Sequence, residues 1–146
     1  MWGGSQMKVK RTDRGWAGHF ICASRCRYRR NTLLEAGRVR VVVSSVGLLE
    51  RREYDKPDKD LLALLGGTDQ FDTIGAGGRM YETMAFHAKR EGPYWEADVQ
   101  RDVHFTSPWS LNECKHESDL KMDKQHERVV AEISRKMAAG AIGGRK

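Results

Sequence analysis

The alternation of hydrophobic and polar positions predicts four β-strands. In stretch 79–88 mostly apolar residues occupy the even positions, and polar or small residues occupy the odd ones. This period of two is typical of a half-buried strand, so we expect the even face to be the buried one. Stretch 38–49 carries valines on both faces, which indicates burial on both sides. Stretches 15–23 and 95–105 complete the set, with Trp16 and Phe20 as expected core residues of the first.

A different period predicts a helix over 118–138. Ser118 or Asp119 is the expected N-cap, and Arg135-Lys136 favour the C-terminal end. A shorter helix is expected at 57–65, inside the long connection 50–78. The apolar stripe of the long helix recurs at helical spacing and consists of Met122, His126, Val129, Val130, Ile133 and Met137.

These elements predict an α+β fold, with a mostly antiparallel sheet of about four strands and a C-terminal amphipathic helix packed on one face. At 146 residues a single domain is the default. We place that domain at 15–138, between a flexible N-terminal segment at 1–14 and a flexible tail at 139–146. Turns are expected at Ala36-Gly37 and at Gly92-Pro93.

The net charge of +6 is unevenly distributed. Residues 8–52 hold 12 basic and 3 acidic side chains, whereas 53–146 hold 14 basic and 17 acidic ones. A basic N-terminal third attracts nucleic acid, nucleotides or an acidic protein face, although a solvated basic surface without a partner has the same composition. The sequence shows no run of ~18–20 apolar residues and no signal peptide, so we expect no membrane partner and a location in the cytoplasm. Three cysteines do not form a disulfide framework.

The most suggestive cluster of side chains is the stretch 25–32, Arg-Cys-Arg-Tyr-Arg-Arg-Asn-Thr. Guanidinium groups bind phosphate through two parallel hydrogen bonds, and an aromatic ring among them can stack on a base. An arginine-rich strand also serves to protect a sheet edge from aggregation. The candidate ligand-binding residues are Arg27, Tyr28, Arg29, Arg30, Asn31 and Thr32, with Arg79 and His126 as further contributors.

Metal binding and catalysis are the alternatives. Cys22, Cys26, Cys114 and His116 could form a zinc site, with His19 nearby in sequence, but no Cys-x-x-Cys spacing occurs. The sequence contains no nucleophile elbow, Walker loop or His-Glu-x-x-His motif, so we expect neither an enzyme nor a cofactor. His126 lies on the apolar helix stripe, where a histidine is more often a hydrogen-bonded core residue than part of a site.

Four segments resemble a family of small phage and prophage proteins, most of them hypothetical. These are Gly15–Phe20, Arg29–Leu33, Val43–Gly47 and Tyr81–Phe86, the last followed by the helix segment that begins at His126. The resemblance covers roughly residues 15–137. It implies a phage accessory protein of the bacterial cytoplasm. In size and charge the chain is also similar to the Thoeris anti-defence sponges, which sequester nucleotide signals.

The leading hypothesis is therefore a non-enzymatic phage or mobile-element protein that inhibits host defence by binding a phosphate-bearing nucleotide signal. The alternative is a nucleic-acid-binding or protein-binding inhibitor of a host complex, such as a host defence protein. A small zinc-stabilised domain is the third possibility. A homodimer is the default for a small domain with an exposed sheet edge.

Overall fold

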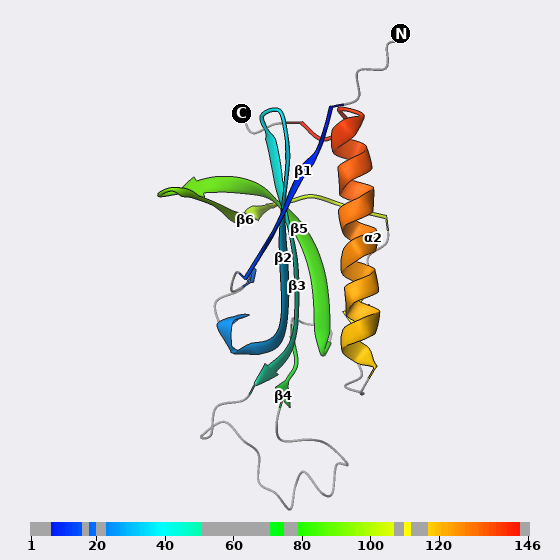
Figure 1. Ribbon diagram of the computed structural model, residues 1–146. Helices are drawn as coiled ribbons and strands as arrows, with labels where there is room; N and C mark the ends of the chain where they lie inside the picture. Colours follow the sequence, from blue (N-terminus) through cyan, green and yellow to red (C-terminus); the bar gives the residue numbers. More distant parts are fainter. Residues whose placement is uncertain are drawn as a thin grey trace, which may run out of the picture.

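A computed structural model describes residues 7–15, 18–19, 23–50, 71–74, 79–106, 110–111 and 117–143. Within these ranges the chain forms an antiparallel sheet of seven strands and one long α-helix, α2 (Figure 1). The α+β class is confirmed, but the sheet has more strands than the four expected. No helix in these ranges is long and apolar enough to cross a membrane. The strands are β1 (Lys10–Arg14), β2 (Cys26–Ala36), β3 (Val39–Glu50), β4 (Phe71–Asp72), β5 (Tyr81–Glu91), β6 (Tyr94–Asp102) and β7 (Ser110–Leu111).

The main strands lie next to each other in the order β1-β2-β3-β5-β6. The short strand β4 pairs with β3, and the short strand β7 pairs with β5. The two predicted turns are confirmed as two-residue hairpin loops, in which Ala36 pairs with Val39 and Glu91 pairs with Tyr94. Each loop begins with a glycine at positive φ, 59° at Gly37 and 58° at Gly92. This backbone conformation matches the twist of the flanking strands and is strained for other residues.

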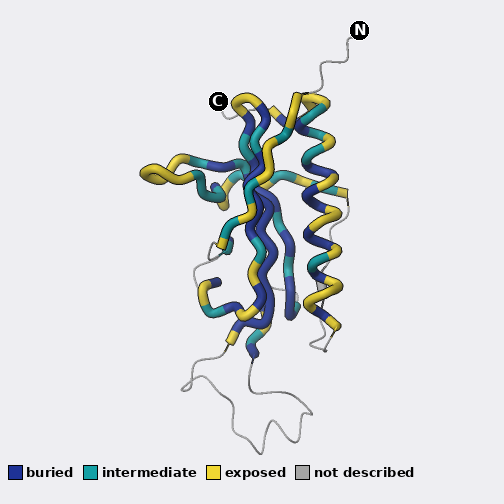
Figure 2. Tube along the Cα trace, viewed as in Figure 1, coloured by how far each residue is buried: buried dark blue, intermediate teal, exposed yellow. Residues whose placement is uncertain are grey.

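β3 is the central strand, and both of its faces are buried, as its valines predicted (Figure 2). Val41 and Val43 pack under α2, whereas Val42 packs on the other face with Leu33 and Ala88. The β5–β6 hairpin bends away on the side opposite α2 (Figure 1). The sheet therefore lies between the helix and this hairpin.

Helix α2 (Ser118–Ala138) has the predicted bounds, and its stripe faces the sheet. The N-cap prediction is wrong, because Glu117 occupies that position without a side-chain cap. Asp119 instead accepts a hydrogen bond from the hydroxyl of Tyr81 at 2.6 Å. The carboxylate thus joins the helix to β5 rather than to its own first turn.

Four other expectations are wrong in part. Residues 10–14, expected to be flexible, form the edge strand β1, whereas the described residues of 15–23 form no strand. The buried face of β5 includes the odd positions Tyr81, Thr83 and Ala85, because these point at the helix. In the expected flexible tail, Ile142 packs into the core. Trp16, Phe20 and the expected helix 57–65 lie outside the described residues.

Candidate functional site

The arginine-rich strand does not form one site, because neighbouring residues of β2 point to opposite faces of the sheet. Tyr28, Arg30 and Thr32 point toward α2 and contact it, whereas Arg29 and Asn31 point away from it. Thr32 and His126 are fully buried, and Tyr28 and Asn31 nearly so. The Tyr28 ring packs edge-on against Tyr81 with centroids 5.5 Å apart, so it is not presented to solvent for stacking on a base.

The predicted arginines differ in their partners. Arg27 pairs with Glu50 at 3.0 Å, and Arg79 pairs with Glu82 at 2.8 Å. Arg30 pairs with Glu127 at 3.1 Å. Arg29 is exposed and makes no ion pair within the described part of the chain. Of the eight predicted ligand-binding residues, Arg29 is thus the one best placed to meet a partner from solution.

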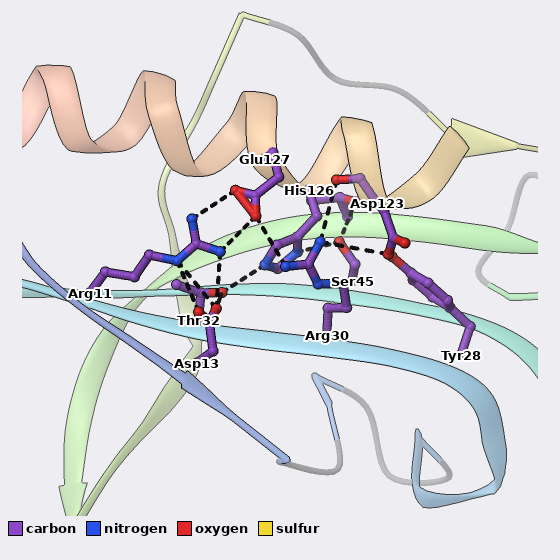
Figure 3. Close-up of polar contacts among 10 residues, drawn as sticks. Arg11, Asp13, Tyr28, Arg30, Thr32, Ser45, Asp123, His126 and Glu127 are labelled. Carbon is purple, nitrogen blue, oxygen red and sulfur yellow. Dashed lines mark hydrogen bonds and ion pairs between the residues drawn. The ribbon is translucent and has the colours of Figure 1, made fainter. Parts of the chain in front are cut away.

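Most of the others belong to a polar network between α2 and the sheet, here called the polar seam (Figure 3). Arg11 donates to both carboxylate oxygens of Glu127 at 2.7 Å, and Arg30 donates to the same carboxylate at 3.1 Å. The hydroxyl of Tyr28 donates to Asp123 at 2.8 Å. Helix and sheet are therefore joined by paired charges as well as by apolar packing. The seam consists of Arg11, Asp13, Tyr28, Arg30, Thr32, Ser45, Thr83, Asp123, His126 and Glu127.

His126 lies at the centre of the seam. Only one assignment of donors and acceptors satisfies the hydrogen bonds around its ring. Thr32 donates its only hydroxyl proton to Asp13 at 2.7 Å, so the bond of 2.8 Å between Thr32 and His126 requires Nε2–H of the ring as donor. Nδ1 of the neutral ring then accepts the hydroxyl of Ser45 at 2.8 Å, and Ser45 accepts from Thr83 at 2.6 Å. Asp13 thereby sets the tautomer of His126 through Thr32.

Burial, followed by the positive charge of Arg30, lowers the pKa of His126 to about 4. The hydrogen bond from Arg11, strengthened by Arg30, lowers the pKa of Glu127 to about 2. Burial and Asp123 raise the pKa of Tyr28. At neutral pH the seam thus holds an uncharged histidine, a protonated phenol and charged carboxylates, the combination that its hydrogen bonds require.

A serine hydroxyl on a histidine resembles the pair that activates a nucleophile. Here, however, Ser45, Thr32 and His126 are each 0% exposed. A substrate cannot reach the Ser45 hydroxyl while α2 is docked. The geometry therefore supports a role in holding the helix, in which every buried hydroxyl and ring nitrogen has a partner.

A second histidine lies on the other face of β3. His19 Nδ1 is 2.9 Å from the hydroxyl of Ser44, and His19 Nε2 is 2.9 Å from Glu82. The hydrogen bond from His19, with that from Arg79, lowers the pKa of Glu82, so its carboxylate stays charged. Ser44 is fully buried as well. The adjacent residues Ser44 and Ser45 thus each bind a histidine, on opposite faces of the sheet.

The arginine–tryptophan cluster, formed by Arg14, Arg40, Arg90 and Trp95, lies on the face away from α2. The guanidinium carbons of Arg40 and Arg90 are 4.2 Å and 5.3 Å from the centroid of the Trp95 ring. Arg14 donates to the backbone carbonyl of Trp95 and, at 2.8 Å, to the side chain of Asn31. These distances fit cation–π contacts. The contacts hold the β5–β6 hairpin over the sheet.

The charges of this cluster are only partly compensated. Arg40 pairs with Glu35 at 3.1 Å. Burial lowers the pKa of Arg14, while Glu96 and Glu35 oppose that shift. Arg90 and the exposed Arg29, which lies further along the same face of the sheet, make no ion pair within the described residues. We call these four arginines and Trp95 the basic face.

Neither the two serine–histidine pairs, Ser45–His126 and Ser44–His19, nor the basic face was predicted from the sequence. Two serines inside the valine-rich β3 were the available signal for the first, because buried hydroxyls need hydrogen-bond partners. For the second, three arginines distant in sequence converge on Trp95 only through strand pairing. No local motif could have indicated them.

Three of the four predicted zinc ligands, Cys22, Cys114 and His116, lie outside the described residues. Cys26 is buried beside Ala23 and Val46. Among the described residues no group of three or more potential metal ligands occurs.

Comparison with known proteins adds no relative. A scan against protein-family models, a search of curated proteins and a search of solved structures each return no match. The resemblance to phage and prophage proteins stays a prediction.

Proposed function

We propose that this protein binds single-stranded nucleic acid through the basic face of its sheet. The observation that supports this best is the gathering of Arg14, Arg40 and Arg90 around Trp95, on the side opposite α2. Guanidinium groups contact phosphate oxygens, which every nucleotide sequence carries. The Trp95 ring lies under Arg40 and packs against the cluster of Leu33, Val42 and Ala88, so it positions the guanidinium groups.

The length of the basic face favours a strand over a single nucleotide. Arg29 and Glu35 lie on the same face of β2, and Glu35 pairs in register with Arg40 of β3. Six residues of extended chain separate Arg29 from this pair, which corresponds to roughly 20 Å. Arg14, opposite Asn31 in register, lies between them. A mononucleotide would contact only part of such a row, whereas an extended polyanion can contact all of it.

The proposed ligand bears phosphate, as expected from the sequence, but most of the residues proposed to bind it are different. Arg29 is retained, and Arg14, Arg40, Arg90 and Trp95 replace residues that the fold buries and the ion-paired Arg27 and Arg79. Inhibition of a host defence system by sequestering such a ligand stays a hypothesis about the biological role.

Fluorescence anisotropy with a labelled oligonucleotide of about 12 nucleotides tests the proposal. We expect binding that weakens with salt, and a mononucleotide should compete poorly. Replacing two phosphate contacts in the double variant Arg29→Gln/Arg90→Gln should reduce the slope of log K against log salt by about 1.4.

The matched control is Arg27→Gln/Lys89→Gln, which removes the same charge from residues already paired with Glu50 and Glu91. It should bind almost as the unmodified protein does. Equal weakening in both variants would show that only net charge matters, and tighter binding of the mononucleotide than of the strand would overturn the proposal.

A further inference from the structure

The outward face of α2 carries a row of basic residues, here called the basic stripe: Lys121, Lys124, Arg128 and Arg135. They follow one another at i, i+3, i+7 and i+14 and are all exposed. Fourteen residues of helix correspond to about 21 Å. The buried residues of α2 occupy the other side of the helix, so the stripe is turned toward solvent. The β5–β6 hairpin lies on the opposite side of the sheet from α2 (Figure 1).

The acidic residues of the same helix do not neutralise this stripe, because their side chains are engaged elsewhere. Asp119 and Asp123 accept the hydroxyls of Tyr81 and Tyr28. Glu127 binds two arginines of the sheet, Arg11 and Arg30. Glu132, the fourth acidic residue of α2, accepts hydrogen bonds from Thr106 and pairs with Lys136 at 3.1 Å. The acidic side chains of the helix are therefore engaged by residues outside the stripe.

Within the described residues, Lys124, Arg128 and Arg135 make no ion pair. Lys124 and Arg128 are four residues apart, and like charges at this spacing destabilise an isolated helix. Arg135 lies in the last turn, where a positive charge favours the helix. Stabilisation of the helix does not account for Lys124 and Arg128.

We infer that the basic stripe of α2 is a second phosphate-contacting surface, so that one protein molecule holds two nucleic-acid strands, one on each side. This inference rests on the proposed function of the basic face. A polyanion is the partner that the charge fits, because apolar area on this flank is limited to residues such as Leu120 and Ala131. A short strand bound along the basic face does not reach the stripe without passing around the sheet.

Energy transfer between two short oligonucleotides, one carrying a donor and one an acceptor, tests the inference. Each has about 12 nucleotides and cannot pair with the other. We expect transfer when the unmodified protein is added, and loss of transfer at excess protein, because each strand then binds a separate protein molecule. The variant Lys124→Gln/Arg128→Gln should bind a first strand with unchanged affinity but lose the energy transfer. Glutamine is a good helix former, so α2 should stay folded, which circular dichroism checks.

The control variant Arg27→Gln/Lys89→Gln should retain both binding and transfer. Mass photometry should find one protein per bridged pair of strands, and a complex with two proteins would assign the bridging to a dimer and overturn the inference. Binding of one strand without any transfer would also overturn it, while leaving the proposed function intact. Absence of any strand binding would overturn both. If polyglutamate but no second strand binds the stripe, the partner is an acidic protein and the inference is wrong.

Discussion

The two faces of the sheet both carry charged side chains but use them differently. On the face covered by α2, Arg11 and Arg30 meet Glu127 at 2.7 Å and 3.1 Å, and His126 is enclosed by hydroxyl groups. On the other face, Arg40 and Arg90 lie over the Trp95 ring, and the exposed Arg29 makes no ion pair within the described residues.

Neighbouring residues of one strand show the contrast most directly. Arg29 and Arg30 are chemically identical, yet only Arg30 meets acidic partners on α2. A paired, partly buried charge contributes to holding the helix, whereas an exposed charge without a partner is available to a ligand. The comparison predicts that stability and binding can be separated by substitution.

The largest expected effect on the helix-covered face comes from Gly47→Ala. A Cβ at this position would lie 2.1 Å from a ring carbon of Tyr81, whose hydroxyl is held by Asp119. Because the ring is buried and cannot move freely, we expect a loss of about 3 kcal/mol in the free energy of unfolding, at the upper end for overpacking. Urea denaturation measures it. Gly15→Ala is the control, because nothing lies within 4 Å of its Cβ, and an equal loss there would contradict this account.

The second effect is a loss of stability in acid that depends on His126. Its pKa is about 4 in the folded protein, below the ordinary value near 6.5, so below pH 6.5 the unfolded chain binds a proton that the folded one does not. Stability from this group is fully present above pH 6.5 and is lost as the pH falls toward 4. Between pH 6.5 and 5 we expect a loss of about 2 kcal/mol.

Burial also lowers the pKa of His87, so the contribution of His126 has to be separated from that of His87. Comparing the unmodified protein with the variant His126→Gln separates them. The variant should be less stable at neutral pH and should show a flatter pH dependence in this window, where carboxylates titrate little. Parallel stability curves for the two proteins would show that the ring is not the titrating group.

The smallest effect on stability comes from the neighbouring pair Arg29→Gln and Arg30→Gln. Arg30→Gln should lower the free energy of unfolding by about 1 kcal/mol, because its bonds to the seam are lost, and should leave strand binding unchanged. Arg29→Gln should change stability by less than about 0.5 kcal/mol and weaken strand binding. Calorimetry and anisotropy on the same two samples provide the measurement, and the reverse assignment would refute the division between the faces.

Much of the fold could be predicted from local patterns. The helix 118–138, the strand at 38–49 and the turns at Gly37 and Gly92 depend on periodicity and on backbone preferences, which are properties of short segments. The described residues of 15–23 form no strand, because apolar alternation by itself does not establish strand pairing. The basic segment at 10–14 forms a strand through its pairing with β2, which nothing in its composition indicates.

The sequence by itself determined the fold class, the central valine-rich strand, the amphipathic helix and the basic character of the first third of the chain. The tertiary structure alone decided which arginines meet a carboxylate, because Glu127 is 97 residues from Arg30 along the chain. It also decided that His126 binds Thr32 and Ser45, and that Arg14, Arg40 and Arg90 gather around Trp95. A side chain's pairing and exposure depend on which face of which strand it occupies and on what packs there. These are relations between distant segments, which no local pattern contains.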